Sequence, residues 1–309
     1  MPDLPIEILP EIFTYLSSPL RVREAHEFPW YLGKVCSRWR ALLFSMRSAF
    51  WTKIEIDWYY DAKDNLRIIR LCKRIKMTLP FFLSRTQGAP FSFSLFRTIG
   101  YPDKKSVRWI LKDLLDHSRQ WGEALIRLRT ADFNILRSAK GHLPLLKKLE
   151  IIESPPHKGR NASLTGLFKD APLLTHVVLH NDLAWEFDWS SLTTFNIGSH
   201  ENTTETLAIF PKTVNLVELT IGCAVVDVGI RLIHFPHLEC LSIHEGKLLA
   251  VLDTPALRRL KILAHPDEDV FKTNVVVDFL CRSRLRLTLV EKSHHGYRMT
   301  LVHTSTIRD

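Results

Sequence analysis

The sequence lacks long apolar runs and a recognisable secretory leader. No apolar segment approaches the roughly 20 residues that a bilayer-spanning helix requires. The chain opens with Met1-Pro2-Asp3, which places an acid where a secretory signal has a basic region, and no long apolar stretch follows it. We therefore expect no membrane span and no membrane partner, and a cytoplasmic or nuclear location.

The cysteines are few, odd in number and widely spaced, and no two of them form a Cys-x-x-Cys pair. That spacing excludes a zinc knuckle and a thioredoxin-type redox site. For a protein without a secretory signal, it predicts buried, reduced thiols. The five positions are Cys36, Cys72, Cys223, Cys240 and Cys281.

The common catalytic and nucleotide-binding motifs are also missing: there is no GxxxxGK[ST], GxGxxG, HExxH or GxSxG sequence. The 14 histidines are dispersed, and the adjacent pair His294-His295 precedes Gly296 in what we interpret as a solvated turn rather than a metal site. We therefore expect no enzymatic activity, no cofactor and no metal. An enzyme with an unfamiliar site, assembled only by the fold, stays an alternative.

What is present is a chain that can build a sizeable core. Its 309 residues are 46% hydrophobic and 24% charged, which excludes a disordered, collagenous or disulfide-stapled class. Folding of a chain this long buries about 70–75% of its unfolded surface. Charge is unevenly placed: residues 1–150 carry 26 basic and 15 acidic side chains, a net of +11, whereas the remainder has a net of −2. The asymmetry indicates two unlike parts.

The N-terminus predicts a small helical module. Asp3-Leu4-Pro5 favours a helix start, because proline fits the first turn, and Ser17-Ser18-Pro19 favours its end. A second amphipathic stretch covers 35–46, and a short alternating strand follows at 54–56. The apolar stripe expected on one face of the first helix consists of Ile8, Leu9, Ile12, Phe13 and Leu16.

Three pieces of this module resemble an F-box: residues 4–16 read LPIEILPEIFTYL, residues 35–40 read VCSRWR, and Trp51 follows. The sequence from Trp30 to Arg40 resembles the large fungal F-box families in particular. The stretch between Leu16 and Val35 is longer than is common in that family and contains two prolines. The alternative is an ordinary helical cap on the next domain.

The resemblance implies a substrate-receptor subunit of a cullin-RING ubiquitin ligase of the SCF type. Such a subunit docks on a Skp-type adaptor, which is carried by the cullin scaffold, and holds a target protein that the sequence does not identify. We expect it to be monomeric within the complex. The residues that the resemblance assigns to adaptor binding are Leu4, Pro5, Ile8, Leu9, Ile12, Phe13, Leu16, Val35, Cys36, Trp39 and Trp51.

The segment after the module predicts a third amphipathic helix over 64–79, then a strand over 91–96, a helix over 107–115 and a strand over 124–128. The third helix should bury one side and expose basic residues with no acid among them. Basic amphipathic helices bind membranes or nucleic acid in some proteins, but we interpret this one as a solvated face. Its predicted buried positions are Leu66, Ile69, Cys72 and Ile75.

Six later segments share the pattern L-x-x-L-x-L with Val, Ile or Phe allowed at the apolar places. Their first members are separated by 28, 18, 24, 22 and 19 residues, which brackets the period of about 20–29 residues of leucine-rich repeats. The pattern predicts one parallel strand per repeat, with helical turns such as 229–234 and 275–281 between some repeats and one further strand at 285–289. The three apolar members are Leu146/Leu149/Ile151, Leu174/Val177/Leu179, Leu192/Phe195/Ile197, Leu216/Leu219/Ile221, Leu238/Leu241/Ile243 and Leu257/Leu260/Ile262.

The fold class expected is therefore α/β (α+β): a helical F-box-like module at 1–57, a connector at 58–123 that opens the solenoid, and an irregular leucine-rich-repeat-like domain with a parallel sheet at 124–309. A mixed α/β domain with coincidental leucine spacing is the competing interpretation. The positions between the apolar members should face solvent, and they form a polar strip without aromatic anchors. The residues predicted to hold a target there are His176, His180, Asn196, Glu218, Thr220, Ser242, His244, Arg259 and Lys261.

Two other functions stay open besides the ligase subunit. The basic first half is compatible with nucleic-acid binding, which a steep salt dependence would reveal, although no reading helix, RNP motif or zinc finger is present and we do not expect nucleic acid as a partner. The repeats are also compatible with a general protein-interaction scaffold outside a ubiquitin ligase.

Overall fold

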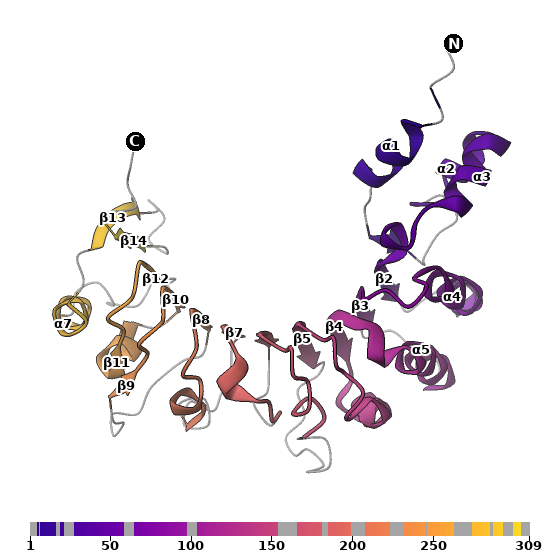
Figure 1. Cartoon of the computed structure of the whole chain (residues 1–309). Helices are drawn as coiled ribbons and strands as arrows, with labels where there is room; N and C mark the ends of the chain where they lie inside the picture. Colours follow the sequence, from indigo (N-terminus) through magenta and orange to yellow (C-terminus); the bar gives the residue numbers. More distant parts are fainter. Residues whose placement is uncertain are drawn as a thin grey trace. The chain divides into compact units, whose positions relative to one another are not determined.

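The computed structural model of the chain is mixed α/β, with a mostly parallel sheet (Figure 1). This confirms the fold class that the repeats predict. By backbone proximity the chain divides into an N-terminal unit, 1–172, and a C-terminal unit, 173–309; the domain limits drawn from the sequence stay predictions. The structure describes residues 5, 7–16, 19–21, 28–58, 65–97, 104–153, 166–180, 185–198, 208–222, 232–244, 246–262, 274–284, 287–292 and 299–303.

The N-terminal unit begins with short helices. Its helices are α1 (Leu9–Tyr15), α2 (Leu32–Val35), α3 (Ser37–Ser45), α4 (Asn65–Arg85) and α5 (Lys104–Asp116), with 3-10 helices η1 (Ser48–Trp51), η2 (Ser118–Gln120) and η3 (Thr130–Ala139). Its strands are β1 (Leu20–Arg21), β2 (Lys53–Trp58), β3 (Phe91–Arg97), β4 (Trp121–Leu128) and β5 (Lys148–Glu153).

The first helix begins later than the sequence predicts. Regular α-helix starts at Leu9, not near Pro5, and Pro10 occupies its first turn. A helix that started at Pro5 would place Pro10 in its interior, where the missing N–H removes a backbone hydrogen bond. Glu7 and Ile8 lie in a turn instead, and the Ile8 N–H donates to the Pro5 carbonyl oxygen at 3.2 Å.

The second amphipathic stretch is two helices, because Cys36 adopts an extended backbone between α2 and α3. The Cys36 thiol accepts a hydrogen bond from the Trp39 N–H at 3.5 Å, so the side chain caps α3. Cys36 is exposed rather than buried as predicted, and so is Cys281. Cys72 is buried, Cys240 is partly exposed, and Cys223 lies outside the described residues.

The strands of the N-terminal unit form a parallel sheet in the order β1-β2-β3-β4-β5. Each strand alternates buried apolar side chains with solvent-facing ones, as in Phe91-Ser92-Phe93-Ser94-Leu95, where the apolar residues are buried and the serines are not. Helices α4 and α5 cover the buried face (Figure 1). The strands predicted at 54–56, 91–96 and 124–128 are therefore members of one sheet.

Helix α4 is longer than predicted because it continues through Pro80 to Arg85. Phe82, one turn beyond the predicted end at Leu79, is fully buried and stacks on Trp30 with ring centroids 5.5 Å apart. This packing favours helical continuation despite the proline. Ile69, predicted to be buried, is half-exposed, because the buried side of α4 is formed by Leu71, Cys72, Ile75, Leu79, Phe82 and Leu83. The side chain of Leu66, also predicted to be buried, lies outside the described ones.

The C-terminal unit is built on the repeats. All six L-x-x-L-x-L segments form strands, the first of them β5 in the N-terminal unit, and their 18 apolar members are buried. The five strands of the C-terminal unit run parallel in the order β6-β7-β8-β10-β12. They are β6 (His176–Leu179), β7 (Thr194–Ile197), β8 (Glu218–Ile221), β10 (Cys240–Ile243) and β12 (Arg259–Ile262).

Neighbouring repeats of this unit are joined by a recurring backbone contact. At the start of β7, β8, β10 and β12, two consecutive N–H groups donate to one carbonyl oxygen of the preceding repeat: Thr193 and Thr194 donate to the Thr175 oxygen at 2.9 and 3.0 Å. The pattern recurs at the carbonyl oxygens of Thr193, Val217 and Glu239. Backbone groups therefore provide the regular link between repeats, as expected when each repeat stacks on its neighbours.

The remaining elements of this unit depart from the simple repeat. Ile233–His234, predicted as a helical turn, is the strand β9, which pairs parallel with β11 (Leu252–Asp253). The predicted helical return at 275–281 is confirmed as α7 (Val275–Arg282). The last strands, β13 (Leu287–Lys292) and β14 (Met299–His303), are antiparallel, in the order β12-β14-β13. The 3-10 helices are η5 (Trp189–Ser191), η6 (Phe210–Lys212) and η7 (Gly246–Val251).

Candidate protein-binding surfaces

The N-terminal module, residues 5–51 as far as they are described, has a small aromatic core. Leu9 and Phe13, four residues apart on α1, are buried, and the Phe13 ring meets Trp39 of α3 edge-to-face at 5.2 Å. Trp51 is fully buried, and its indole N–H donates to the Met46 carbonyl oxygen at 3.3 Å. Three predicted adaptor-binding residues, Leu9, Phe13 and Trp51, therefore hold the module together and are not available to a partner.

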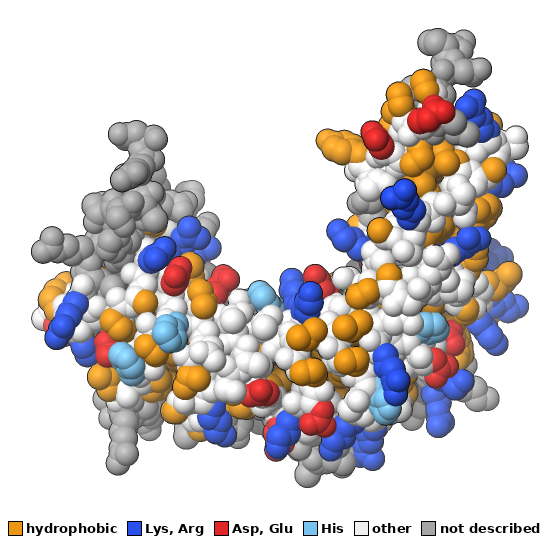
Figure 2. Space-filling view, in the orientation of Figure 1, with side chains coloured by type: hydrophobic (Ala, Val, Ile, Leu, Met, Phe, Trp, Pro, Cys, Tyr) orange, Lys and Arg blue, Asp and Glu red, His pale blue; other side chains and the backbone are white. Residues whose placement is uncertain are grey.

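An apolar and exposed strip lies next to this buried pair along α1. Ile8 is 44% exposed, Tyr15 93% and Leu16 43%; Ile12 between them is partly exposed. Positions 8, 12, 15 and 16 share one side of a helix, so they form a continuous stripe, which we call the α1 stripe. Figure 2 shows hydrophobic side chains exposed over α1.

The other predicted adaptor-binding residues lie as follows. Val35 is 58% exposed at the end of α2, Pro5 and Cys36 are exposed, and Trp39 is partly exposed. Leu4 lies outside the described residues. The single apolar face predicted for residues 8–16 is therefore divided between a buried pair and an exposed stripe. Tyr15 was missed by the sequence analysis, although its helical spacing from Ile8 and Ile12 was the available signal.

Aromatic packing joins this module to α4. Trp51 lies against Phe81 and Phe82 with centroid distances of 5.6 and 5.8 Å, and Trp30 stacks on Phe82. Arg85 of α4 also donates to the Phe44 carbonyl oxygen at 2.9 Å. Each ring pair in this arrangement contributes about 0.5–1.5 kcal/mol of stability beyond that of burial. The ring contacts therefore hold the module in one orientation on α4.

The predicted target-binding residues lie on the solvent-facing side of the C-terminal unit's sheet. The register aligns them in two rows across the strands: His176, Glu218 and Arg259 share one row, and Asn196, Thr220, Ser242 and Lys261 share the next. His180 and His244 each follow the end of a strand. None of these nine described side chains is buried, which confirms the predicted alternation but does not test whether they bind a target.

Charges on this face are mixed, and Cys240, a thiol among its described residues, is a poor nucleophile. Cys240 lies between Glu218 and Arg259 in the register. Burial raises the pKa of the Cys240 thiol, and Arg259 opposes that rise only in part. The thiol is therefore protonated at neutral pH, which disfavours a nucleophilic role. The chemistry of this face is suited to hydrogen bonding and charge pairing.

A second solvent-facing surface lies on the sheet of the N-terminal unit and contains a pocket of about 340 Å³. Its floor includes Ser92 and Ser94 of β3, whose short side chains leave room between the longer residues of β2 and β4. This site was not predicted, although the Phe-Ser-Phe-Ser alternation at 91–94 was a signal for it. The lining is Pro19, Lys53, Ile54, Ser92, Phe93, Ser94, Glu123, Ala124, Leu125, Lys148 and Glu150.

The described part of the chain contains no group of three or more His, Cys, Asp or Glu side chains placed to hold a metal ion. None of the helices seen within the described ranges is both long enough and apolar enough to cross a bilayer. Comparison of the chain with models of known protein families and with curated proteins finds no match.

Proposed function

We propose that the chain is the substrate-receptor subunit of a cullin-RING ubiquitin ligase of the SCF type. In this proposal the α1 stripe, together with Val35 and Trp39, binds a Skp-type adaptor, and the sheet faces hold a target protein. The chain performs no covalent step itself, and ubiquitin transfer belongs to the partner subunits.

The observation that carries the proposal is the exposed apolar side of α1. Large apolar side chains that face solvent along one helix are an unfavourable arrangement for an isolated protein and are typical of an interaction site. Anchors at positions i, i+4, i+7 and i+8 suit a partner with a hydrophobic groove. This stripe lies within the segment that resembles an F-box, at 4–16.

The division of the module into core and surface gives the proposal a specific form. Leu9, Phe13 and Trp51 set the geometry from inside. Among the described residues, those exposed enough to touch the adaptor are Pro5, Ile8, Ile12, Tyr15, Leu16, Val35, Cys36 and Trp39. Substitutions in the first group would unfold the module, whereas exposed positions in the second group can be changed without removing core contacts. Binding can therefore be tested apart from folding.

The test is co-purification of the full chain with a Skp-type adaptor, compared with the variants Ile8→Asp and Val35→Asp. We expect each variant to weaken adaptor binding by about tenfold or more, because it places a charge in an apolar contact. The matched control is Val277→Asp, since Val277 is 59% exposed on α7 and Val35 is 58% exposed on α2.

Circular dichroism melting of each variant shows whether it is folded. Loss of adaptor binding by both α1 and α2 variants, with Val277→Asp unaffected, supports the proposal. If the wild-type chain does not retain the adaptor, or if the folded variants retain it fully, the chain is not a receptor of this kind.

A further inference from the structure

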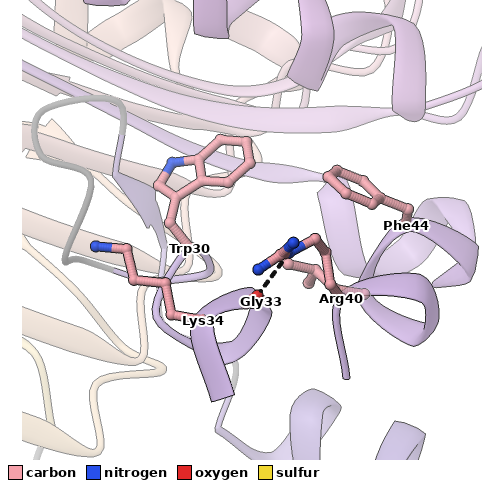
Figure 3. A pocket seen from close by; sticks show the side chains of 6 residues that line it. Trp30, Gly33, Lys34, Arg40 and Phe44 are labelled. Carbon is pink, nitrogen blue, oxygen red and sulfur yellow. Dashed lines mark hydrogen bonds between the residues drawn. The ribbon is translucent and has the colours of Figure 1, made fainter. Parts of the chain in front are cut away.

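A pocket of about 250 Å³ lies on the N-terminal module away from the α1 stripe. It is lined by Trp30, Gly33, Lys34, Arg40, Leu43 and Phe44. Figure 3 shows Trp30 and Phe44 on either side of the Arg40 side chain, whose Nε donates to the Gly33 carbonyl oxygen at 2.8 Å. Lys34 extends at the outer edge beside Trp30 (Figure 3). The pocket therefore combines ring and methyl carbons with two cations.

The surroundings of this pocket are basic. Residues 28–54 contain five lysines and arginines and no aspartate or glutamate, and residues 65–85, which form α4, contain six basic residues and again no acid. None of the described residues that line the pocket is acidic. Figure 2 shows Lys and Arg side chains along the margin where α4 and α5 lie.

Helix α4 leads from these basic residues to the pocket. Lys73, Met77 and Phe81 follow one another at intervals of four residues, so they share one side of the helix; Lys73 is exposed and Met77 is 80% exposed. The Phe81 ring contacts both Trp30 and Phe44, with centroids 5.9 Å apart in each case. Lys73, Met77 and Phe81 therefore form a row of cationic and apolar groups along α4, which ends at the two aromatic rings of the pocket.

Arg85 fixes the wall of the pocket at the end of this path. Its guanidinium carbon lies 5.9 Å from the centre of the Phe44 ring and 5.1 Å from that of Phe81, and the group donates to the Phe44 carbonyl oxygen. Phe44 is therefore held in place by α4. A wall held from two elements is the kind of preorganised feature that favours binding.

We infer that this surface, the pocket together with Lys73 and Met77 of α4, binds an acidic peptide segment of another protein. One bulky apolar side chain of the segment occupies the pocket between Trp30 and Phe44. Its flanking carboxylates pair with Lys34, Arg40 and Lys73. Buried aromatic anchors surrounded by charge pairs are the usual source of affinity at such contacts.

A peptide fits these features better than a nucleic acid does. The Trp30 ring stacks on Phe82 with an interplanar angle of 13°, and the Phe44 ring meets Phe81 at 86°, so both rings already pack against α4. Nucleic-acid sites instead present aromatic faces on which bases stack. The exposed Met77 and the apolar pocket also have no role in phosphate binding.

This inference does not depend on the proposed ligase function. The lining of the pocket shares no residue with the α1 stripe, Val35 or Trp39. Lys34 and Arg40 adjoin Val35 and Trp39 in the chain, so each pocket variant is also assayed for co-purification with the adaptor. Loss of peptide binding with adaptor binding retained, or the reverse, shows which of the two proposals fails.

The test uses fluorescence polarisation of the full chain with a short fluorescein-labelled peptide in which one central phenylalanine is flanked by glutamates. We expect saturable binding at low ionic strength and about tenfold weaker binding by the double variant Lys34→Glu, Lys73→Glu, because two charge pairs become repulsive. Lys34→Arg should bind as the wild type does. The control is Lys140→Glu, Lys212→Glu, which reverses two exposed lysines elsewhere on the chain.

A second peptide, with serine in place of the phenylalanine, tests the pocket without altering the protein. It should bind more weakly, since the apolar anchor is gone. Equal binding of both peptides, or equal binding by the double variant and the wild type, overturns the inference. So does tighter binding of an oligonucleotide of matched charge that is lost in the same variant, because the site then recognises nucleic acid.

Discussion

Gly198 lies where two repeats of the C-terminal unit meet backbone to backbone. A Cβ at this position would be 2.9 Å from the His180 carbonyl oxygen and 3.2 Å from the His180 Cα. These atoms are held by the sheet, since the Gly198 N–H donates to the Leu179 carbonyl oxygen at 2.7 Å. A side chain here must push two strands apart. Glycine is therefore required because there is no room for a Cβ, and not because of its backbone angles.

We therefore expect Gly198→Ala to destabilise the protein by about 1–3 kcal/mol, the usual cost of overpacking. The matched control is Gly33→Ala: its Cβ would lie 3.5 Å from Leu43 Cδ2, an ordinary contact. It should be neutral, or more stable by up to about 1 kcal/mol, because alanine favours helix α2. Urea unfolding, monitored by tryptophan fluorescence, measures the stability of both variants. Equal midpoints for the two variants would contradict the packing argument.

Asp113 of α5 gives a second prediction at the residue scale. Burial raises the pKa of its carboxyl above the ordinary value of 3.8, and the nearby Asp116 raises it further. The folded chain therefore binds this proton more tightly than the unfolded chain does. The contribution of Asp113 to stability is most favourable below about pH 3.8 and is lost as the pH rises through the folded-state pKa.

At pH 7 the ionised carboxylate is thus unfavourable, and Asp113→Asn should raise the melting temperature there. The gain corresponds to less than about 1 kcal/mol because the group is partly solvated and screened, and it should shrink as the pH is lowered toward 4. Asp116→Asn is a second variant, which removes the charge that raises the pKa of Asp113 but also the Lys112–Asp116 ion pair at 3.6 Å, so its gain at pH 7 should be smaller than that of Asp113→Asn. Melting curves of Asp113→Asn and the wild type between pH 4 and 7 test this prediction. An increase in melting temperature that becomes larger on acidification would refute it.

At the scale of elements, the parts that the sequence predicted well are those in which local pattern and burial coincide. The six repeat strands were predictable because each alternates two buried apolar residues with solvent-facing ones, as Leu219 and Ile221 do in β8, and such alternation is typical of a half-buried strand. The parallel sheet follows from the repeat itself.

The elements predicted wrongly depend on contacts between distant segments. Helix α4 runs through Pro80 because Phe82 packs against Trp30 and Trp51, two residues of the preceding module. The strand at Ile233–His234 exists because Leu252–Asp253 lies beside it. The segments that pack on α4 and pair with β9 could not be identified from the sequence alone. The local pattern does not show which distant segment will lie beside an element.

The candidate sites divide in the same way. The apolar stripe of residues 8–16 was predicted, but which of its members face inward was settled by Trp39, which covers Phe13. The pocket at Trp30 and Phe44 was not predicted at all, because its walls come from two helices and the segment before them and its position is fixed from α4. Surfaces assembled from several elements require the fold.

At the scale of the whole molecule, the two units share one principle: each strand is covered by its neighbours, and no repeat has a core of its own. The carbonyl oxygen of Val217 accepts from both Glu239 and Cys240, and the Glu239 oxygen accepts from Arg258 and Arg259. Stability in such an array is close to a sum of repeat and nearest-neighbour terms. Damage to one repeat should therefore spread to adjacent repeats and decline beyond them.

Leu219→Ala in β8 is the direct test, because the side chain is fully buried between β7 and β10. Removing it should cost about 2–5 kcal/mol locally. Amide hydrogen exchange should quicken most in β7, β8 and β10, and least in β3, which belongs to the N-terminal unit. A uniform increase across both units would instead mean that the chain unfolds as one cooperative body, since local opening free energies would then all equal the global one. Under the nearest-neighbour description, adaptor binding through α1 should survive this substitution, because the module that carries the α1 stripe lies in the unit that the substitution does not touch.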